Sequence, residues 1–212
     1  MKYILGFDFD NTLVSYDALM FTRARQLGWV DERVAANKRE IRDAIRTLPD
    51  GENKWQLLQA YAYGPGMPGA RLIEGVKTFL TACRQAGWDM AVVSHKSQFA
   101  SMDTEQTHDL QKTARAWMEA NRFFAADGLG LKHGQIYFEP TRAAKVARIR
   151  TLNCTHFVDD LQETFAEPDF PATTQKLLYV PLIKGNLPDD VRRFAAWEEI
   201  HEHFFAAARS KG

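Results

Sequence analysis

The apolar positions of this chain gather in short runs that end at polar residues. Residues 3–7 form a mostly apolar run that stops at Asp8, Phe9, Asp10 and Asn11, a pattern typical of a buried strand that leads into a polar loop. Similar runs at residues 88–93, 136–138, 155–158 and 177–180 predict four further strands.

The segments between these runs have the spacing of helices. In residues 74–85, Val76, Phe79, Leu80 and Cys83 recur at i, i+3, i+4 and i+7, and Gly87 follows where a helix C-cap is expected. Further helices are predicted around residues 110–121, after a Thr141 cap through residues 145–150, and near residues 197–204. Strands that alternate with helices favour an α/β fold, in which a parallel sheet is covered on both faces.

One long segment does not fit a simple strand–helix–strand connection. Residues 15–71 look helical in pieces, at 17–27, 32–48 and 54–61, and a glycine- and proline-rich link follows at 64–69. We therefore expect a small α-helical cap domain at 15–71, inserted into a core formed by residues 1–14 and 72–212. The alternative is a set of extra helices packed permanently on the core.

Three of the predicted strands end at polar side chains. They lead into Asp8 and Asp10, into Ser94, and into Asp159 and Asp160. The carboxyl ends of parallel strands meet at one edge of a sheet, which predicts an active site there. Carboxylates so close together repel, so the pattern calls for a cation, most simply Mg²⁺, or a raised pKa. Any single pair of this kind can also be a solvated turn.

Taken together, four segments carry a more specific signal. The sequence resembles the haloacid dehalogenase (HAD) superfamily of phosphatases and phosphotransferases in Asp8-x-Asp10-x-Thr12, in residues 92–94, in Lys145 and in residues 157–160, which occur in the order of its four motifs. The resemblance covers residues 3 to about 163. It implies a Rossmann-like, HAD-like core and Mg²⁺-dependent phosphoryl transfer through an aspartyl-phosphate.

The resemblance also implies roles for individual residues. Asp8 would be the nucleophile, and Asp10 the general acid and base. Dehalogenases of the family lack an acid at the position of Asp10, so its presence favours phosphate chemistry. Mg²⁺ would bind Asp8, the main-chain carbonyl of Asp10, Asp159 and, directly or through water, Asp160. The residues expected to bind phosphate or substrate are Asn11, Thr12, Ser94, His95, Arg142 and Lys145.

Some positions near the motifs leave alternatives open. Glu163 is the nearest acidic residue after the fourth motif, and its side chain is long enough to reach the metal without being an expected direct ligand. His95 and Lys96 would contact substrate or be solvated. Arg142, three residues before Lys145 on the same helical face, would hold the phosphate or orient Asp160.

Composition limits the classes of partner. The 27 basic and 27 acidic side chains balance to a net charge of zero, which argues against nucleic acid and anionic membranes as partners. No apolar run approaches a membrane span, and Asp8 and Asp10 interrupt the first one. The two cysteines, Cys83 and Cys154, have no metal-binding spacing and do not suggest a disulfide framework, so we expect a protein of the reducing cytoplasm.

The function expected from the sequence is a phosphatase of a small phosphorylated metabolite. The alternatives are a phosphotransferase or mutase with the same motifs and a non-catalytic module that binds a phosphorylated metabolite. The sequence names neither the substrate nor the acceptor of the phosphoryl group, nor which cap residues set specificity, nor the oligomeric state.

Overall fold

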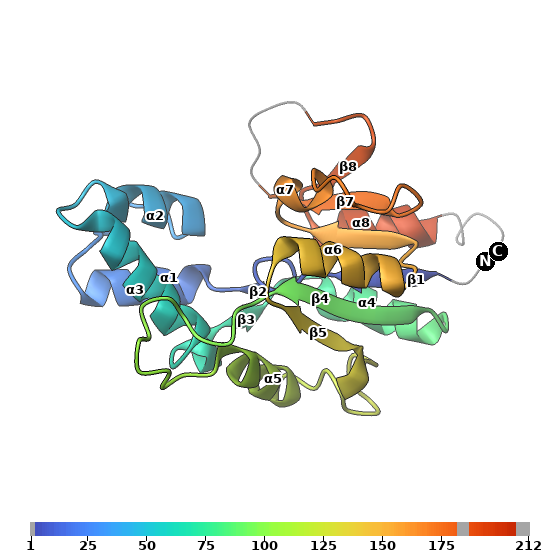
Figure 1. Ribbon diagram of the computed structural model, residues 1–212, viewed down its shortest axis with the longest axis horizontal. Helices are drawn as coiled ribbons and strands as arrows, with labels where there is room; N and C mark the ends of the chain where they lie inside the picture. The colour runs from blue at the N-terminus through green and yellow to red at the C-terminus, as the bar shows by residue number, and fades with distance from the viewer. Residues whose placement is uncertain (1–2, 182–186, 207–212) are drawn as a thin grey trace. The chain divides into compact units, whose positions relative to one another are not determined.

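The computed structural model describes residues 3–181 and 187–206 (Figure 1). Its strands are β1 (Ile4–Phe7), β2 (Val14–Ser15), β3 (Arg71–Leu72), β4 (Asp89–His95), β5 (Ile136–Glu139), β6 (His156–Asp159), β7 (Gln175–Tyr179) and β8 (Val191–Phe194). Its α-helices are α1 (Asp17–Gln26), α2 (Lys38–Arg46), α3 (Gly51–Tyr63), α4 (Val76–Gln85), α5 (Leu110–Ala120), α6 (Arg142–Thr151), α7 (Gln162–Phe165) and α8 (Trp197–Phe205). Two short 3-10 turns are η1 (Met67–Gly69) and η2 (His133–Gln135).

Six strands form one sheet in the order β5-β4-β1-β6-β7-β8, and every neighbouring pair is parallel. The first strand lies in the middle because its residues are apolar and buried and can be covered on both faces. The predicted α/β fold with a Rossmann-like parallel sheet is confirmed.

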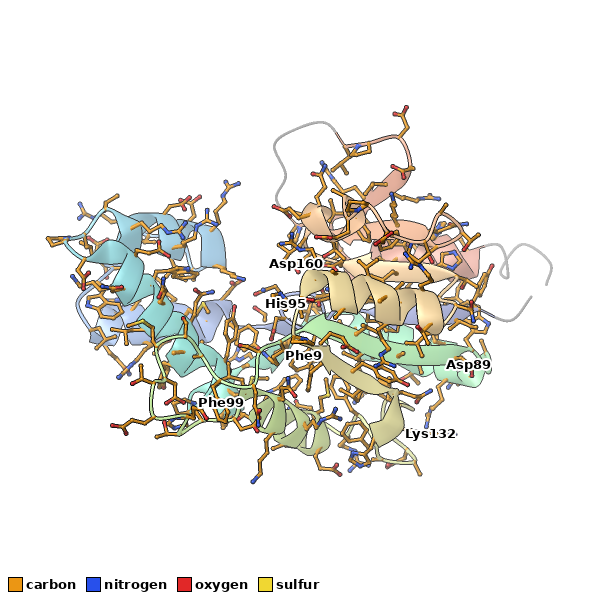
Figure 2. All side chains as sticks on the ribbon, viewed as in Figure 1. Phe9, Asp89, His95, Phe99, Lys132 and Asp160 are labelled. Carbon is orange, nitrogen blue, oxygen red and sulfur yellow. The ribbon has the colours of Figure 1, made fainter. Side chains whose placement is uncertain are left out.

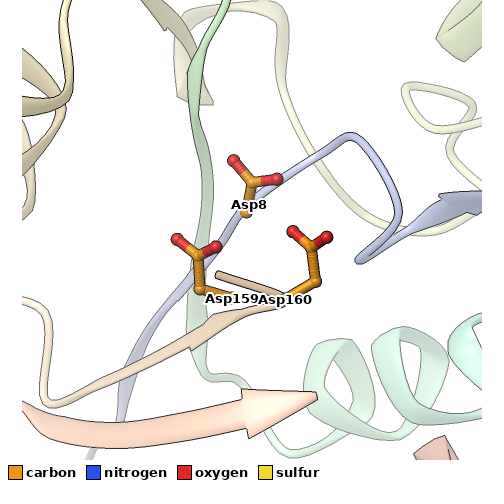
Figure 3. A group of neighbouring side chains, drawn as sticks. All are labelled: Asp8, Asp159 and Asp160. Atoms are coloured by element: carbon orange, nitrogen blue, oxygen red, sulfur yellow. The ribbon is translucent and has the colours of Figure 1, made fainter. Parts of the chain in front are cut away.

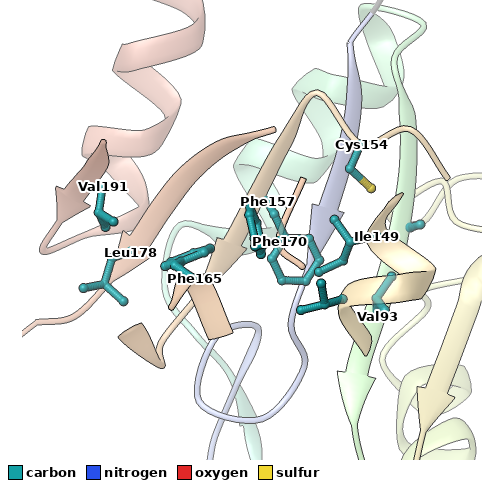
Figure 4. Close-up of a cluster of buried hydrophobic side chains, with 10 residues drawn as sticks. Val93, Ile149, Cys154, Phe157, Phe165, Phe170, Leu178 and Val191 are labelled. Atoms are coloured by element: carbon teal, nitrogen blue, oxygen red, sulfur yellow. The ribbon is translucent and has the colours of Figure 1, made fainter. Parts of the chain in front are cut away.

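One face of the sheet packs against α6. Val146 and Ile149 of that helix join Val93, Phe157 and Leu178 of the strands in a single buried apolar cluster (Figure 4). Removing this apolar surface from water is the main stabilising contribution on this face.

The other face packs against α4 and α8. The Phe7 ring of β1 contacts Phe79 of α4 and Trp197 of α8, and Phe79 and Trp197 also contact each other. Figure 1 shows α6 in front of the sheet and α4 and α8 behind it. The sheet is therefore buried on both sides, as the apolar runs predicted.

One local detail corrects the predicted helix at residues 74–85, and another agrees with the predicted helix end. The helix begins at Val76, because Gly75 has a φ of +82° and lies outside the helical region. A Cβ at Gly75 would meet Trp197 Cβ of α8 at 2.7 Å, and the positive φ also favours glycine at this position. At the other end, Gly87 has a φ of +69°, as expected for the residue that stops the helix.

Other differences from the predicted elements are at the periphery. The helix predicted at 32–48 begins only at Lys38, where the side chain of Asn37 caps it. The sequence pattern missed α7 and the edge strand β8, in which two exposed arginines separate Val191 from Phe194. A strand this short with an apolar residue only at each end lacks the alternation by which strands are recognised.

The contacts divide the chain into two compact units. One comprises the described residues within Met1–Leu13, Leu72–Lys96 and Arg122–Gly212, and contains the six-stranded sheet. The other comprises Val14–Arg71 and Ser97–Asn121, and is mainly helical. The sequence placed residues 97–121 in the core domain, whereas α5 in this segment packs against α3 and η1, and Trp117 Nε1 donates to the Ala70 carbonyl at 3.2 Å.

Both cysteines are free and buried. Burial raises the pKa of the Cys154 thiol to about 12 and also raises that of Cys83. Among the described residues, no helix is long and apolar enough to cross a membrane.

Candidate active site

Three carboxylates gather where two neighbouring strands end. Asp8 follows β1, while Asp159 ends β6 and Asp160 follows it, and the Asp8 main-chain N–H donates to the Val158 carbonyl at 2.9 Å. One oxygen from each of the three side chains lies within 4.8 Å of the others (Figure 3). The structure thus brings together residues 151 and 152 positions apart in the sequence, as the parallel sheet predicted.

Lys145 reaches two of these carboxylates from α6. Its Nζ lies 2.6 Å from Asp8 Oδ1 and 2.6 Å from Asp159 Oδ2, and its side chain is 3% exposed. The helix starts at Arg142 because the Thr141 hydroxyl accepts from the Ala144 N–H at 3.1 Å, which confirms the predicted cap. Lys145 therefore lies one turn into the helix, with its ammonium between the nucleophile candidate and the second strand end.

The burial of this group changes its acid–base behaviour. Burial raises the pKa of Asp8 to about 6; the Lys145 ammonium opposes this rise, and Asp159 and Asp10 add to it. Burial by itself disfavours the charged form of Lys145, but Asp8 and Asp159 outweigh it and raise the pKa of the ammonium. Lys145 therefore stays charged at neutral pH.

Asp10 is paired with Lys96, for which the sequence left contact with substrate or with solvent open. Lys96 Nζ lies 2.8 Å from Asp10 Oδ2 and 3.1 Å from Oδ1, and the Lys96 side chain is 3% exposed. Of the two alternatives, the one in which Lys96 is solvated is wrong. The spacing gave no signal for this pair, because the partners lie 86 positions apart. His95, by contrast, is exposed at the end of β4 (Figure 2).

The loop after Asp8 is held from two directions. The Thr12 hydroxyl is buried and donates to Asp160 Oδ1 at 3.5 Å, and the Thr12 carbonyl accepts from Trp197 Nε1 at 3.0 Å. Asn11 has a φ of 60°, a left-handed conformation that asparagine tolerates better than most residues. These contacts link the loop to the fourth motif and to the core.

The remaining site candidates lie around the three carboxylates. Ser94 is buried in β4, which continues to His95 and not, as predicted, only to residue 93. The Arg142 guanidinium contacts Glu167 at 3.4 Å, with its side chain 40% exposed. Glu163 is exposed on α7 and is not a member of the carboxylate group.

The donor set fits a hard divalent cation. Asp8, Asp159 and Asp160 supply carboxylate oxygens, the ligands that Mg²⁺ prefers. Three ionised carboxylates and the Lys145 ammonium sum to a formal charge of −2, since the Asp10–Lys96 pair is neutral by itself. A dication would bring this buried group to neutrality.

Comparison with known proteins identifies the fold. No family model matches the chain, and no curated protein matches it. Among solved structures, a HAD family hydrolase from Deinococcus radiodurans R1 with bound phosphate and sodium is 16% identical, with a TM-score of 0.56 over 98% of this chain and 96% of that one. A predicted phosphoglycolate phosphatase from Haemophilus somnus 129PT is also 16% identical, with a TM-score of 0.52 over 96% and 98%.

A third similar structure is a HAD-hydrolase from Bacillus subtilis bound to magnesium, which is 15% identical, with a TM-score of 0.50 over 96% of this chain and 99% of that one. The chain therefore has the fold of the HAD-like hydrolases. Solved dehalogenases share this fold as well, so the likeness determines the architecture and leaves the reaction to be argued from the side chains.

Proposed function

We propose that the protein is a Mg²⁺-dependent phosphoric monoester hydrolase of the HAD superfamily that acts on a small phosphorylated metabolite. The observation that carries the proposal is the contact of one buried ammonium, Lys145, with both Asp8 and Asp159 at 2.6 Å. A buried anionic nucleophile beside a fixed cation and a dication site suits the transfer of a phosphoryl group, because positioning and electrostatics supply most of that catalysis.

The reaction would proceed in two displacements at phosphorus. An Asp8 oxygen attacks the phosphorus, the bond to the ester oxygen breaks, and Asp10 gives its proton to the leaving oxygen. Water then attacks the phosphorus of the aspartyl-phosphate, Asp10 takes a proton from that water, and the bond to Asp8 breaks to release phosphate. Asp10 favours this reaction over carbon–halogen cleavage, which requires no proton donor to an ester oxygen.

The other residues would bind and orient the phosphate. Lys145 would offset the charge of the phosphoryl group, and the Ser94 hydroxyl would donate to one of its oxygens. Asp8, the Asp10 carbonyl, Asp159 and Asp160 would hold Mg²⁺, which supplies charge neutralisation for the phosphoryl oxygens. Asn11, Thr12, His95 and Arg142 are the further residues proposed for phosphate or substrate binding.

The helical unit would serve as the cap. It includes Val14–Arg71 together with Ser97–Asn121, so the chain leaves the sheet unit shortly after Asp10 and again directly after Lys96. A lid excludes water from a small substrate during turnover. The two free, buried cysteines support a cytoplasmic location.

The test is release of inorganic phosphate from a panel of phosphate esters, with Mg²⁺ and with EDTA. Turnover should require Mg²⁺ and should be lost in Asp8→Asn, which removes the nucleophile. The matched control is Asp89→Asn, because Asp89 is exposed at the opposite end of β4 from His95 (Figure 2). An active Asp8→Asn variant would reject the aspartyl-phosphate mechanism.

The same panel separates the alternatives. A mutase or other phosphotransferase would move the phosphoryl group to another hydroxyl and leave little free phosphate. A protein that binds a phosphorylated metabolite without turning over any ester would be a non-catalytic module.

A further inference from the structure

Lys96 is a fully buried lysine at the edge of the site. It follows β4 directly, its main-chain N–H donates to the Glu139 carbonyl at 3.0 Å, and its side chain is 3% exposed. Its Nζ lies 5.8 Å from the centre of the Phe9 ring, so the ammonium is held beside an aromatic face as well as a carboxylate. Burying an ammonium costs free energy unless an opposite charge lies beside it, so the position of the partner of Lys96 matters.

The partner is the carboxylate of Asp10, and both of its oxygens are engaged. Distances of 2.8 Å and 3.1 Å from one Nζ to the two oxygens restrict the rotation of the carboxylate about its terminal bond. The Asp10 side chain remains 18% exposed, so it is held by the lysine and yet accessible. Asp8 and Asp159 contact a different ammonium, that of Lys145.

We infer that Lys96 is a positioning residue that holds the Asp10 carboxyl in the orientation needed to transfer a proton to and from the reacting oxygen. This inference rests on the proposed phosphatase function. Lys96 would act only through Asp10 and would not touch the substrate. General acid–base catalysis contributes about 100- to 10,000-fold, and a misplacement of about 1 Å can cost about 100-fold, so the loss of Lys96 should be large.

The test compares two esters that differ in their need for a general acid. An alkyl phosphate has a poor leaving group that requires a proton, whereas 4-nitrophenolate leaves without one. Asp10 also deprotonates the water in the second displacement, which is common to both esters, so the measurement is leaving-group release in a single turnover. Lys96→Met should lower the single-turnover rate of alcohol release from the alkyl ester about 100-fold and that of 4-nitrophenolate release much less. The ester concentration that gives half the maximal single-turnover rate should stay unchanged for both. Lys96→Arg should restore part of the alkyl-ester activity, because it returns a cation to Asp10.

The control is Lys176→Met. Lys176 is also a strand lysine paired with a carboxylate, Asp190, at 2.6 Å, but it lies on β7 outside the site. The kcat of Lys176→Met should match that of the wild type with both esters. If Lys96→Met fails to fold, Lys96→Arg alone must still lose more activity on the alkyl ester than on the aryl ester.

A double-mutant cycle with Asp10→Asn supplies the second measurement. The cycle uses the alkyl ester, for which Lys96→Met has a large effect when Asp10 is present. If Lys96 acts through Asp10, Lys96→Met should change the single-turnover rate with the alkyl ester little in the Asp10→Asn background. Equal losses on both esters, additive losses in the cycle, or a raised half-saturating ester concentration with an unchanged maximal single-turnover rate would each overturn the inference.

Different results reject the phosphatase function and the positioning role of Lys96. A wild-type protein that releases no phosphate from any ester rejects the proposed function, and the inference with it. An active wild type whose Lys96 variants lose both esters equally rejects only the positioning role.

Discussion

Replacing the nucleophile candidate is expected to stabilise the metal-free protein while it abolishes turnover. Asp8 is 5% exposed, and burial raises the pKa of its carboxyl from 3.8 to about 6, against the opposing effect of Lys145. Because the folded state holds this proton more tightly than the unfolded chain, protonation of Asp8 contributes stability that is fully present below pH 3.8 and is lost as the pH rises through about 6.

The size of the effect follows from the pKa. At about 1.36 kcal/mol per pKa unit, a rise from 3.8 to about 6 means that ionised Asp8 destabilises the fold by about 3 kcal/mol at neutral pH. Asparagine has nearly the same shape and no charge, and Lys145 keeps Asp159 as a partner. For a chain of this length, about 3 kcal/mol corresponds to a Tm increase of up to about 10 °C in Asp8→Asn.

The assay is thermal unfolding in EDTA at about pH 7.5 and again near pH 4, with Asp89→Asn as the control. The stabilisation should be present at about pH 7.5 and should shrink near pH 4, where the wild-type carboxyl is protonated. Mg²⁺ should then stabilise the wild type more than Asp8→Asn, because binding to the folded state alone raises stability. A Tm of Asp8→Asn at or below that of the wild type at about pH 7.5 would refute the electrostatic reasoning.

Three further results are expected. Burial, with a smaller effect of His203, lowers the pKa of His156 to about 4. The stability contributed by the neutral imidazole is therefore fully present above pH 6.5 and is lost as the pH falls through about 4. In urea denaturation, the unfolding free energy of His156→Gln should fall by about 3 kcal/mol less over this pH range than that of the wild type, and equal decreases would contradict this. Asp159→Asn should weaken Mg²⁺ binding in calorimetry by more than about 100-fold, whereas Glu163→Gln, at an exposed position, should leave it unchanged. Gly75→Ala should destabilise the protein by about 1–3 kcal/mol more than Gly87→Ala. Both positions have a positive φ, but only a Cβ at Gly75 meets α8. Equal losses of unfolding free energy in the two variants would show that the contact with α8 does not limit position 75 to glycine.

The elements that the sequence predicted well are those whose pattern is local. The alternation of apolar runs with helical spacing predicted five of the strands in the sheet, and the Thr141 cap and Gly87 marked helix ends. Elements without such a pattern were missed or misplaced. The strand β8 has too few apolar residues, and the start of α2 depends on the Asn37 cap within a polar stretch.

The site also has a part that local sequence predicted and a part that depends on packing. The sequence alone determined that Asp8, Asp159 and Asp160 stand at strand ends, and a parallel sheet then brings such ends to one edge. The contact of Lys145 with two of them depends on how α6 packs on the sheet, and the family resemblance, not the spacing, pointed to it.

Only the tertiary structure decided what Lys96 does and which unit contains residues 97–121. Lys96 and Asp10 are 86 positions apart, and nothing in the neighbourhood of either residue distinguishes a buried ion pair from two solvated charges. The helix α5 likewise has an apolar face that could pack in either unit. The hydrogen bond from Trp117 to the Ala70 carbonyl places it in the helical unit. Local periodicity determines which residues are buried, whereas the partner of a buried residue is set by packing between segments distant in the chain.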